Sequence, residues 1–410
     1  MGMPEALSAG FAAAVLALGL SPRLTLWVRE TCRPGLGRVV ERGQKWVHWA
    51  QCFRSPVLDY FHASIAALVS IEFYVTFLPL AIWSGHRRLG LQLVLLLSAS
   101  LFAGNSLKDV FCAPRPERAL RVVKDPLTQH FAEEYGMPST HAINSAVFAA
   151  HLARYARRWA DQEGDPAMYS GTHAEWLLVA LCAEICFGRL YLGMHTPADI
   201  LVGLAVAGLV TASFGYANDA GLDHWVLQSV GLIPALVLLV LAATFGYPTP
   251  EAFTPSYGYS TYFVGVTCGV LCGAKVTAPH LWPDFPAADP AAVVVEFPPA
   301  SFSQFAARSA VGAAVTATCM ATASAAAGIL VPRFHGLLGR AGLPIDLVDA
   351  RGRPVGKVQK GPKGGAWRLT LHAKTPARLL TYFAVGWAVC DPSFRVMRAL
   401  GLLDAPDAGV

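Results

Sequence analysis

Five long apolar stretches constrain this chain more than any other feature of its sequence. Each is close to the roughly 20 residues that a helix needs to cross a bilayer. Only 14% of the chain is charged, against about 25% in soluble domains, so it lacks the charge to coat a water-facing surface. We therefore expect an integral membrane protein. The five stretches contain no Asp, Glu, Lys or Arg and cover residues 89–107, 200–218, 225–250, 252–274 and 309–332.

Four further stretches are apolar but interrupted by polar residues or proline. Glu72 and Pro79 interrupt the first, and Asp391 with Pro392 breaks the last. Polar residues at membrane depth are costly and usually face the bundle interior or a water-filled cavity. With these stretches the chain is predicted to be all-α, a polytopic transmembrane bundle of eight or nine spans, with an uncertain span at 7–22. The four stretches are residues 60–84, 139–158, 174–192 and 378–400.

The remaining segments divide the chain into three regions. Residues 1–59 form an N-terminal segment whose basic, Trp-containing part at 29–54 predicts a helix in the membrane interface. Residues 60–218 are expected to form a membrane core. Residues 219–410 are expected to add further helices, joined by a Pro-rich loop at 279–300 and a basic, Gly-rich loop at 346–375. The net charge of +5 is too small to predict nucleic-acid binding.

Three polar motifs lie within the core, and the first two stand on either side of the connection at 117–137. Lys108 and Arg115 lie seven positions apart, where an apolar stretch ends. Cations also reach toward headgroups at membrane boundaries, so this pair alone leaves its role open. The second motif, Pro138-Ser139-Thr140-His141, begins a helix whose free N–H groups and positive dipole end suit an anion. A capped helix with an incidental histidine fits the motif too.

The third motif runs from Gly188 to Asp199. Arg189 near the end of one span and His195 in the turn before the next are hard to explain by packing. Asp199 follows His195 by four residues, near enough to orient its imidazole. Asp199 also completes Thr196-Pro197-Ala198-Asp199, a capping-box sequence, so a purely structural role for this carboxylate stays open.

The predicted topology brings these motifs to one side of the membrane. The first ends one helix, the second begins the next helix, and the third follows the return of the chain. Together they supply three cations, two histidines and a carboxylate beside a histidine. This set suits phosphoryl transfer through a phosphohistidine: cations hold the non-bridging oxygens, one His attacks phosphorus and the other protonates the leaving alkoxide.

The ordered pattern Lys-x6-Arg-Pro, Pro-Ser-x-His and Arg-x5-His-x3-Asp resembles the type-2 phosphatidic acid phosphatase superfamily. The resemblance extends to its sphingosine-1-phosphate phosphatase branch, because Thr140 stands where most lipid phosphatases have Gly. The segment from Arg189 to His195, the segment from Glu72 to Trp83 and the helix around 265–275 are also similar to that branch. The motifs cover about residues 108–199.

The resemblance implies a core of the lipid phosphatase/haloperoxidase type and a role for each motif residue. His195 is expected to be the nucleophile, Asp199 its orienting partner and His141 the general acid and base. No cofactor and no metal ion is implied. Gly188 departs from the family, which usually has Ser there, and the missing hydroxyl removes one expected phosphate contact. The expected phosphate-binding residues are Lys108, Arg115, Ser139, Thr140 and Arg189.

The function predicted from this resemblance is hydrolysis of a long-chain sphingoid base 1-phosphate, a lipid phosphate, in sphingolipid metabolism. A broader lipid phosphate phosphatase that acts on phosphatidate or isoprenoid phosphates is one alternative. A lipid-binding or transport protein that reuses the scaffold without turnover is another. The family implies an endoplasmic reticulum protein with a lumenal active site, whereas the basic segments 29–54 and 333–378 favour a cytosolic position for the same face.

Overall fold

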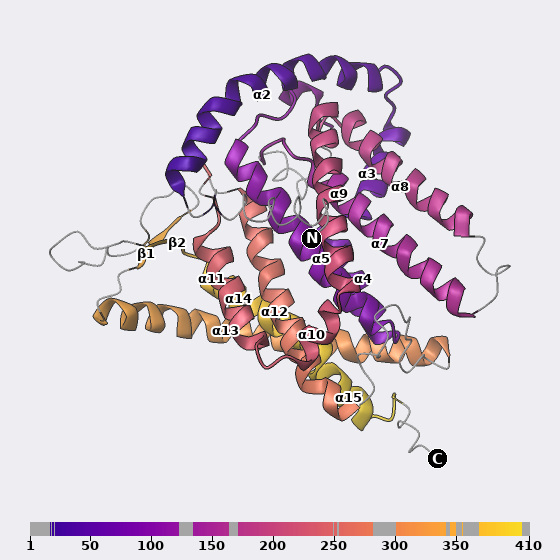
Figure 1. Ribbon diagram of the computed structural model, residues 1–410, viewed down its shortest axis with the longest axis vertical. Helices are drawn as coiled ribbons and strands as arrows, with labels where there is room; N and C mark the ends of the chain where they lie inside the picture. Colours follow the sequence, from indigo (N-terminus) through magenta and orange to yellow (C-terminus); the bar gives the residue numbers. More distant parts are fainter. Residues whose placement is uncertain are drawn as a thin grey trace.

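Helices make up almost all of the structure (Figure 1), which confirms the predicted all-α class. The structure is a computed structural model. It describes residues 17, 19, 21–122, 134–163, 171–248, 250–251, 254–281, 301–341, 345–349, 355 and 369–403.

Helix α2 (Pro22–Ala50) arches across one end of the molecule (Figure 1). Its Arg29 side chain donates hydrogen bonds to the backbone carbonyls of Asp109 (2.7 Å) and Val110 (3.0 Å), near the end of α5. On the outer side, Trp46 and Trp49 are exposed. Exposed tryptophans on a basic helix are typical of the membrane interface. The segment predicted to lie there is thus part of one long helix that covers this end of the bundle.

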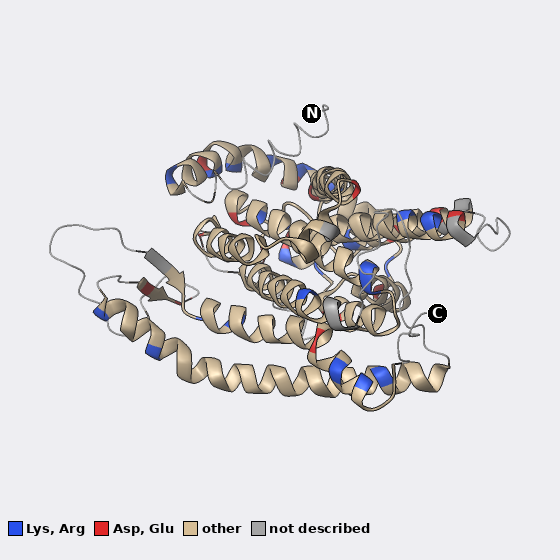
Figure 2. Cartoon of the chain, turned by 60° about the horizontal axis from the view of Figure 1, so that its bottom comes forward, with Lys and Arg blue, Asp and Glu red and all other residues tan. Residues whose placement is uncertain are grey.

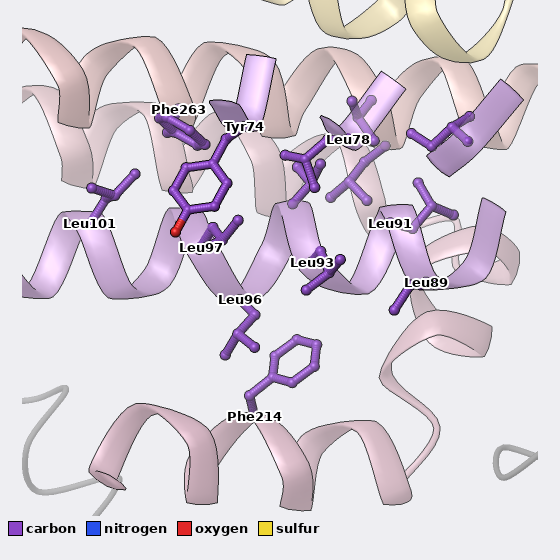
Figure 3. Close-up of a cluster of buried hydrophobic side chains, with 14 of the residues drawn as sticks. Tyr74, Leu78, Leu89, Leu91, Leu93, Leu96, Leu97, Leu101, Phe214 and Phe263 are labelled. Atoms are coloured by element: carbon purple, nitrogen blue, oxygen red, sulfur yellow. The ribbon is translucent and has the colours of Figure 1, made fainter. Parts of the chain in front are cut away.

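Helix α5 (Arg87–Phe111) is the centre of the core and is buried along most of its length. Helices α3 (Pro56–Ala67) and α4 (Ile71–Trp83) precede it. Figure 3 shows leucines of α5 packed among side chains of three other helices: Tyr74 and Leu78 of α4, Phe263 of α12 (Pro255–Leu281) and Phe214 of α9 (Pro197–Asp219). The helix whose end carries the first motif is therefore held on several sides.

Helices α7 (Thr140–Glu163) and α8 (Gly171–Tyr191) pack against each other (Figure 1). Helix α7 also packs against α9 and α5, whereas α8 packs against α3. Helix α7 leads away from the end covered by α2, and α8 returns to it. The end of α5, the start of α7, the end of α8 and the start of α9 therefore meet at one end of the bundle. This is the arrangement that the sequence predicted for the three motifs.

The C-terminal half adds a second group of helices to this core. Helices α12 and α14 (Thr375–Cys390) pack most closely: a β-carbon on Gly269 would lie 2.0 Å from the Phe383 carbonyl oxygen, so only glycine permits this approach. Strands β1 (Ile345–Val348) and β2 (Leu369–His372) pair in parallel, with Ile345 opposite Leu369. The remaining α-helices are α10 (Leu222–Gln228), α11 (Leu232–Phe245), α13 (Phe302–Arg340) and α15 (Pro392–Ala399), and a 3-10 helix, η1 (Arg118–Leu120), follows α5.

Three of the described helices, α5, α9 and α13, are long and apolar enough to cross a membrane. Helices α3 and α4 form a further candidate, bent by 47° at a short break. Figure 2 shows long stretches of helix without Lys, Arg, Asp or Glu between the charged regions. The chain is an integral membrane protein, while the predicted number of eight or nine spans stays a prediction.

The structure corrects two of the predicted spans. The stretch 225–250 is not one helix: Ser229 separates α10 from α11, and its Oγ accepts a hydrogen bond from the Gly231 N–H at 2.9 Å. The stretch 60–84 breaks between Ala67 and Ile71 rather than at Pro79, which lies inside α4. Residues 7–22 lie mostly outside the described residues, as does most of the loop 279–300.

Candidate active site

Arg115 joins the first motif to the third. Its Nη1 donates to the Met194 carbonyl oxygen at 2.9 Å and lies 3.4 Å from Nε2 of His195. On the other side, its Nε donates to the Glu134 carbonyl oxygen at 2.8 Å. Arg115 is only 7% exposed, so these contacts fix the guanidinium against the histidine.

Lys108 joins the first motif to the second. Its ammonium donates to Oε2 of Glu134 at 2.8 Å and to the Thr140 hydroxyl at 3.3 Å. The side chain is 1% exposed, although it lies near the end of a helix. A cation reaching toward headgroups would be exposed, so the boundary-anchor interpretation of Lys108 is wrong.

Ser139 joins the second motif to the third. Its backbone N–H donates to the Asp199 carbonyl oxygen at 3.0 Å, and its hydroxyl accepts from the Ala142 N–H at 3.4 Å as a cap of α7. A β-carbon on Gly203 would lie 2.7 Å from the Ser139 carbonyl oxygen. Glycine at this position therefore lets α9 approach the start of α7.

A tight turn between α8 and α9 presents His195. Gly193 in this turn has a φ of +68°, a conformation that residues other than glycine rarely adopt. A β-carbon there would also lie 2.1 Å from the Leu120 carbonyl oxygen, so the turn packs directly on the segment that follows Arg115. The backbone N–H of His195 donates to the Arg189 carbonyl oxygen at 3.3 Å, which ties the turn to the end of α8.

Asp199 forms the capping box that its sequence position allowed, and it also lies near His195. Its Oδ2 accepts hydrogen bonds from the N–H (2.7 Å) and the hydroxyl (3.0 Å) of Thr196, which completes the capping box. The same oxygen lies 3.8 Å from Nδ1 of His195, which is beyond hydrogen-bond distance, and this nitrogen has no hydrogen-bond partner among the described residues. The carboxylate faces Nδ1, which leaves Nε2 as the nitrogen directed toward Arg115.

Arg189 differs from the other two cations because its side chain has no hydrogen-bonded acceptor among the residues that the structure describes. It is 7% exposed, and its Nε is buried without a partner among the residues that the structure describes. A buried cation is normally paired, because desolvation costs several kcal/mol per ion. His141 is half-buried one residue after Thr140 and makes no described hydrogen bond. These two side chains retain unused hydrogen-bonding capacity beside the cluster.

The electrostatic environment of His195 is strongly positive. Burial, and then the charges of Arg115, Arg189 and Lys108, lowers the pKa of His195 well below its ordinary value. The imidazole is therefore neutral at physiological pH and has a lone pair for attack. No group of three His, Cys, Asp or Glu side chains within the described part of the chain is placed to hold a metal ion.

Gly188 does not face the cations. A β-carbon at this position would lie 3.4 Å from the β-carbon of His62 on α3. A serine here would therefore begin beside α3, so the expected loss of a phosphate contact at Gly188 does not follow from this geometry.

Glu134 is the residue at this site that the sequence analysis missed. It is 8% exposed and pairs with Lys108, and its Oε2 lies 3.4 Å from Nη2 of Arg115. Its position five residues before Ser139 was the available signal, because an acid so close to a predicted anion site requires an explanation.

Comparison with known proteins agrees with this arrangement. A protein-family model described as "PAP2 superfamily" matches residues 89–220, which contain all three motifs. This segment is a PAP2 superfamily domain. Within the fold, the PAP2 domain extends from α5 to the end of α9.

The sequence similarity to known proteins extends beyond the segment that the PAP2 superfamily model matches. It is 38% identical to lipid phosphate phosphatase delta of Arabidopsis thaliana over 61% of this chain and 59% of the relative. It is 27% identical to a dihydrosphingosine 1-phosphate phosphatase of Saccharomyces cerevisiae, over 62% of each chain. Sphingosine-1-phosphate phosphatase 2 of Mus musculus is 30% identical over 51% of this chain and 56% of the relative. The chain thus spans 56% to 62% of the length of these three relatives. No solved structure matches it.

Proposed function

We propose that this protein is a membrane phosphatase that hydrolyses a long-chain sphingoid base 1-phosphate to the free base and inorganic phosphate. The observation that carries the proposal is the buried guanidinium of Arg189, which lacks a hydrogen-bonded acceptor among the described residues and lies beside His195, Arg115 and Lys108. A phosphate dianion would supply the acceptors that Arg189 lacks. The names of the relatives, which include two sphingoid base phosphate phosphatases, support the substrate class.

The proposed reaction proceeds through a phosphohistidine. Nε2 of His195 attacks phosphorus while Lys108, Arg115 and Arg189 bind the non-bridging oxygens. Ser139 and Thr140 at the start of α7 add donors to the same oxygens. Cations held in place before the reaction stabilise the charge of the transition state without reorganisation.

Proton transfer completes the cycle. The bound phosphate dianion offsets the neighbouring cations and thereby favours protonation of His141. Protonated His141 then donates its proton to the leaving alkoxide oxygen, so the free lipid alcohol departs. The same imidazole then takes a proton from the water that attacks the phosphohistidine, which releases phosphate and regenerates His195. Asp199 keeps Nδ1 of His195 oriented and supports the positive charge that develops on the ring. The step needs no metal ion, since side-chain cations supply the counter-charge.

Phosphate release by the purified protein from a panel of lipid phosphates tests this proposal. We expect the highest kcat/KM for the sphingoid base phosphate and lower values for phosphatidate and isoprenoid phosphates. Arg189→Ala should reduce the rate on every substrate. A higher kcat/KM on phosphatidate would favour the broader lipid phosphatase, and binding without turnover would favour a lipid-binding or transport protein.

We also propose that the site faces the lumen of the endoplasmic reticulum. In sealed vesicles whose outer surface is cytosolic, a membrane-impermeant aryl phosphate should then be hydrolysed only after permeabilisation. Full activity in intact vesicles would place the site on the cytosolic face instead, as the basic segments favour.

A further inference from the structure

Glu134 places a buried carboxylate among the side chains proposed to bind phosphate. Its Oε2 accepts a hydrogen bond from Lys108 at 2.8 Å and lies 3.4 Å from Nη2 of Arg115. Its backbone carbonyl accepts a further bond from Arg115 at 2.8 Å. The residue is thus fixed to two of the three cations through both its side chain and its backbone.

This carboxylate is ionised. Burial alone would raise the pKa of Glu134, but the charges of Lys108 and Arg115 overcome that effect and lower the pKa below its ordinary value. A negative charge at this place opposes the binding of a phosphate dianion, because like charges repel. A site that bound only a phosphate group would bind it more tightly with a neutral side chain at position 134.

The position of Glu134 relative to the nucleophile defines what else the site can bind. One guanidinium spans the two groups: Nη1 of Arg115 faces Nε2 of His195, and Nη2 faces Oε2 of Glu134. The contacts with Lys108 and Arg115 are both on Oε2, and the Ser256 side chain also lies beside the carboxylate. A carboxylate can accept about four hydrogen bonds in total, so it retains capacity for a donor from a bound molecule.

We propose that Glu134 binds the ammonium group of the substrate and thereby selects sphingoid base phosphates over lipid phosphates without an amine. This inference rests on the proposed function. In such a substrate the amine is on the carbon next to the phosphate ester carbon, so phosphate and ammonium are separated by only a few bonds. When phosphorus lies at Nε2 of His195, the ammonium is within reach of the Glu134 carboxylate, because the guanidinium of Arg115 contacts both residues. The ammonium also offsets the repulsion between Glu134 and the phosphate.

A matched pair of substrates tests the inference. One is a sphingoid base 1-phosphate, and the other has the same chain with a hydroxyl in place of the amine. We expect the wild-type protein to favour the amine by about 10- to 100-fold in kcat/KM, the usual worth of a hydrogen bond between charged groups. In Glu134→Gln the ratio should fall close to one, mainly through a lower kcat/KM for the amine.

Glu117 offers a matched control, because it is an exposed acid in the same connection. Glu117→Gln should keep the wild-type preference. If Glu134→Gln does not fold, Glu134→Asp keeps the charge on a shorter side chain, and its preference for the amine should fall several-fold.

Three results would overturn the inference. Equal loss on both substrates in Glu134→Gln would mean that Glu134 only positions Lys108 and Arg115. A wild-type protein that hydrolyses both substrates equally would remove the selective role while leaving the proposed function intact. Phosphate release from neither substrate would contradict the proposed function and the inference together.

Discussion

At the scale of single residues, the proposed chemistry depends on how His195 is held. Nδ1 faces Asp199 at 3.8 Å, and Nε2 lies 3.4 Å from Arg115. The two ring nitrogens therefore have different neighbours, one acidic and one basic. In the proposed mechanism, Nδ1 is oriented by Asp199, and Nε2 attacks phosphorus in place of its contact with Arg115.

The lowered pKa of His195 predicts how kcat/KM depends on pH. A histidine whose pKa lies below its ordinary value stays neutral as the pH falls, so the nucleophile is retained in mild acid. The acid limb of kcat/KM, which reports the free enzyme, should therefore lie below about pH 6.5. The measurement is the pH profile of the wild-type protein, with the ionisation of the substrate phosphate determined separately and divided out. A corrected inflection at or above 6.5 would show that the surrounding cations do not act on His195 in this way.

Asp199→Asn separates orientation from helix capping. The amide oxygen of Asn can still accept from Thr196, so the melting temperature should stay close to that of the wild type. The loss of the charge facing Nδ1 should lower kcat by about 10²-fold or more, because the imidazole loses its orienting partner. Kinetics and a thermal melt of the same preparation check this. Wild-type kcat with an unchanged melting temperature would limit Asp199 to its capping box.

At the scale of elements, the site depends on how closely four helix ends approach one another. Helix α9 can reach the start of α7 only because residue 203 is glycine, and the turn before α9 packs on residues 120 and 121 only because residue 193 is glycine. These approaches place the second and third motifs in direct contact through the Ser139 to Asp199 backbone hydrogen bond.

Gly203→Ala should disturb this approach, and Gly208 on the same helix provides the control. The new methyl group at 203 would lie 2.7 Å from the Ser139 carbonyl oxygen, whereas nothing lies within 4 Å of a β-carbon at 208. Overpacking typically costs 1–3 kcal/mol, so Gly203→Ala should lower stability and reduce kcat by about 10-fold or more. Gly208→Ala should leave both unchanged or raise stability slightly. Equal behaviour of the two variants would show that the contact between α7 and α9 does not position the site.

The elements also show which features the sequence could predict. Long uncharged stretches gave the helical class and the helices α5, α9 and α13, because hydropathy acts over a whole span. The breaks between helices were harder to predict from the sequence. Helices end after Ala67 and before Ser229, whereas Pro79 lies inside a helix. Such breaks depend on local hydrogen bonds and neighbouring helices, which hydropathy does not contain.

The candidate site, too, could be predicted from the sequence only in part. The spacing of the motifs predicted that Lys108, Arg115, Ser139 and His195 would meet, because each lies at a helix end on one side of the bundle. Glu134 could not be assigned in the same way. It lies in the connection between α5 and α7 rather than at a helix end, so only the folded chain shows that its carboxylate reaches Lys108.

At the scale of the whole molecule, the bundle builds its anion site from side-chain cations. Lys108 and Arg115 come from the first motif and Arg189 from the third, and all three are buried. Helix α2 lies across the same end, anchored through Arg29 to the end of α5. The arrangement encloses positive charge at one end of an otherwise apolar bundle, where the electrostatic attraction for an anion is strongest.

Because side-chain cations supply the positive charge at this site, we predict that the protein is active without a metal ion. Phosphate release by the detergent-solubilised protein should persist at the wild-type rate in excess chelator, since the guanidinium and ammonium groups supply the counter-charge. The measurement compares initial rates with and without chelator, and after added Mg²⁺. Strict dependence on Mg²⁺ would contradict the proposed mechanism.

The central claim is that His195 carries the phosphoryl group, and rapid-quench trapping tests it most directly. With a radiolabelled aryl phosphate, whose leaving group needs little protonation, wild-type protein and His141→Ala should both acquire an alkali-stable label, and the label should persist longer in His141→Ala because water activation is lost. His195→Ala should acquire none. Mapping of the label to His195 would support the account, whereas a labelled His195→Ala variant, or a label on His141, would contradict it.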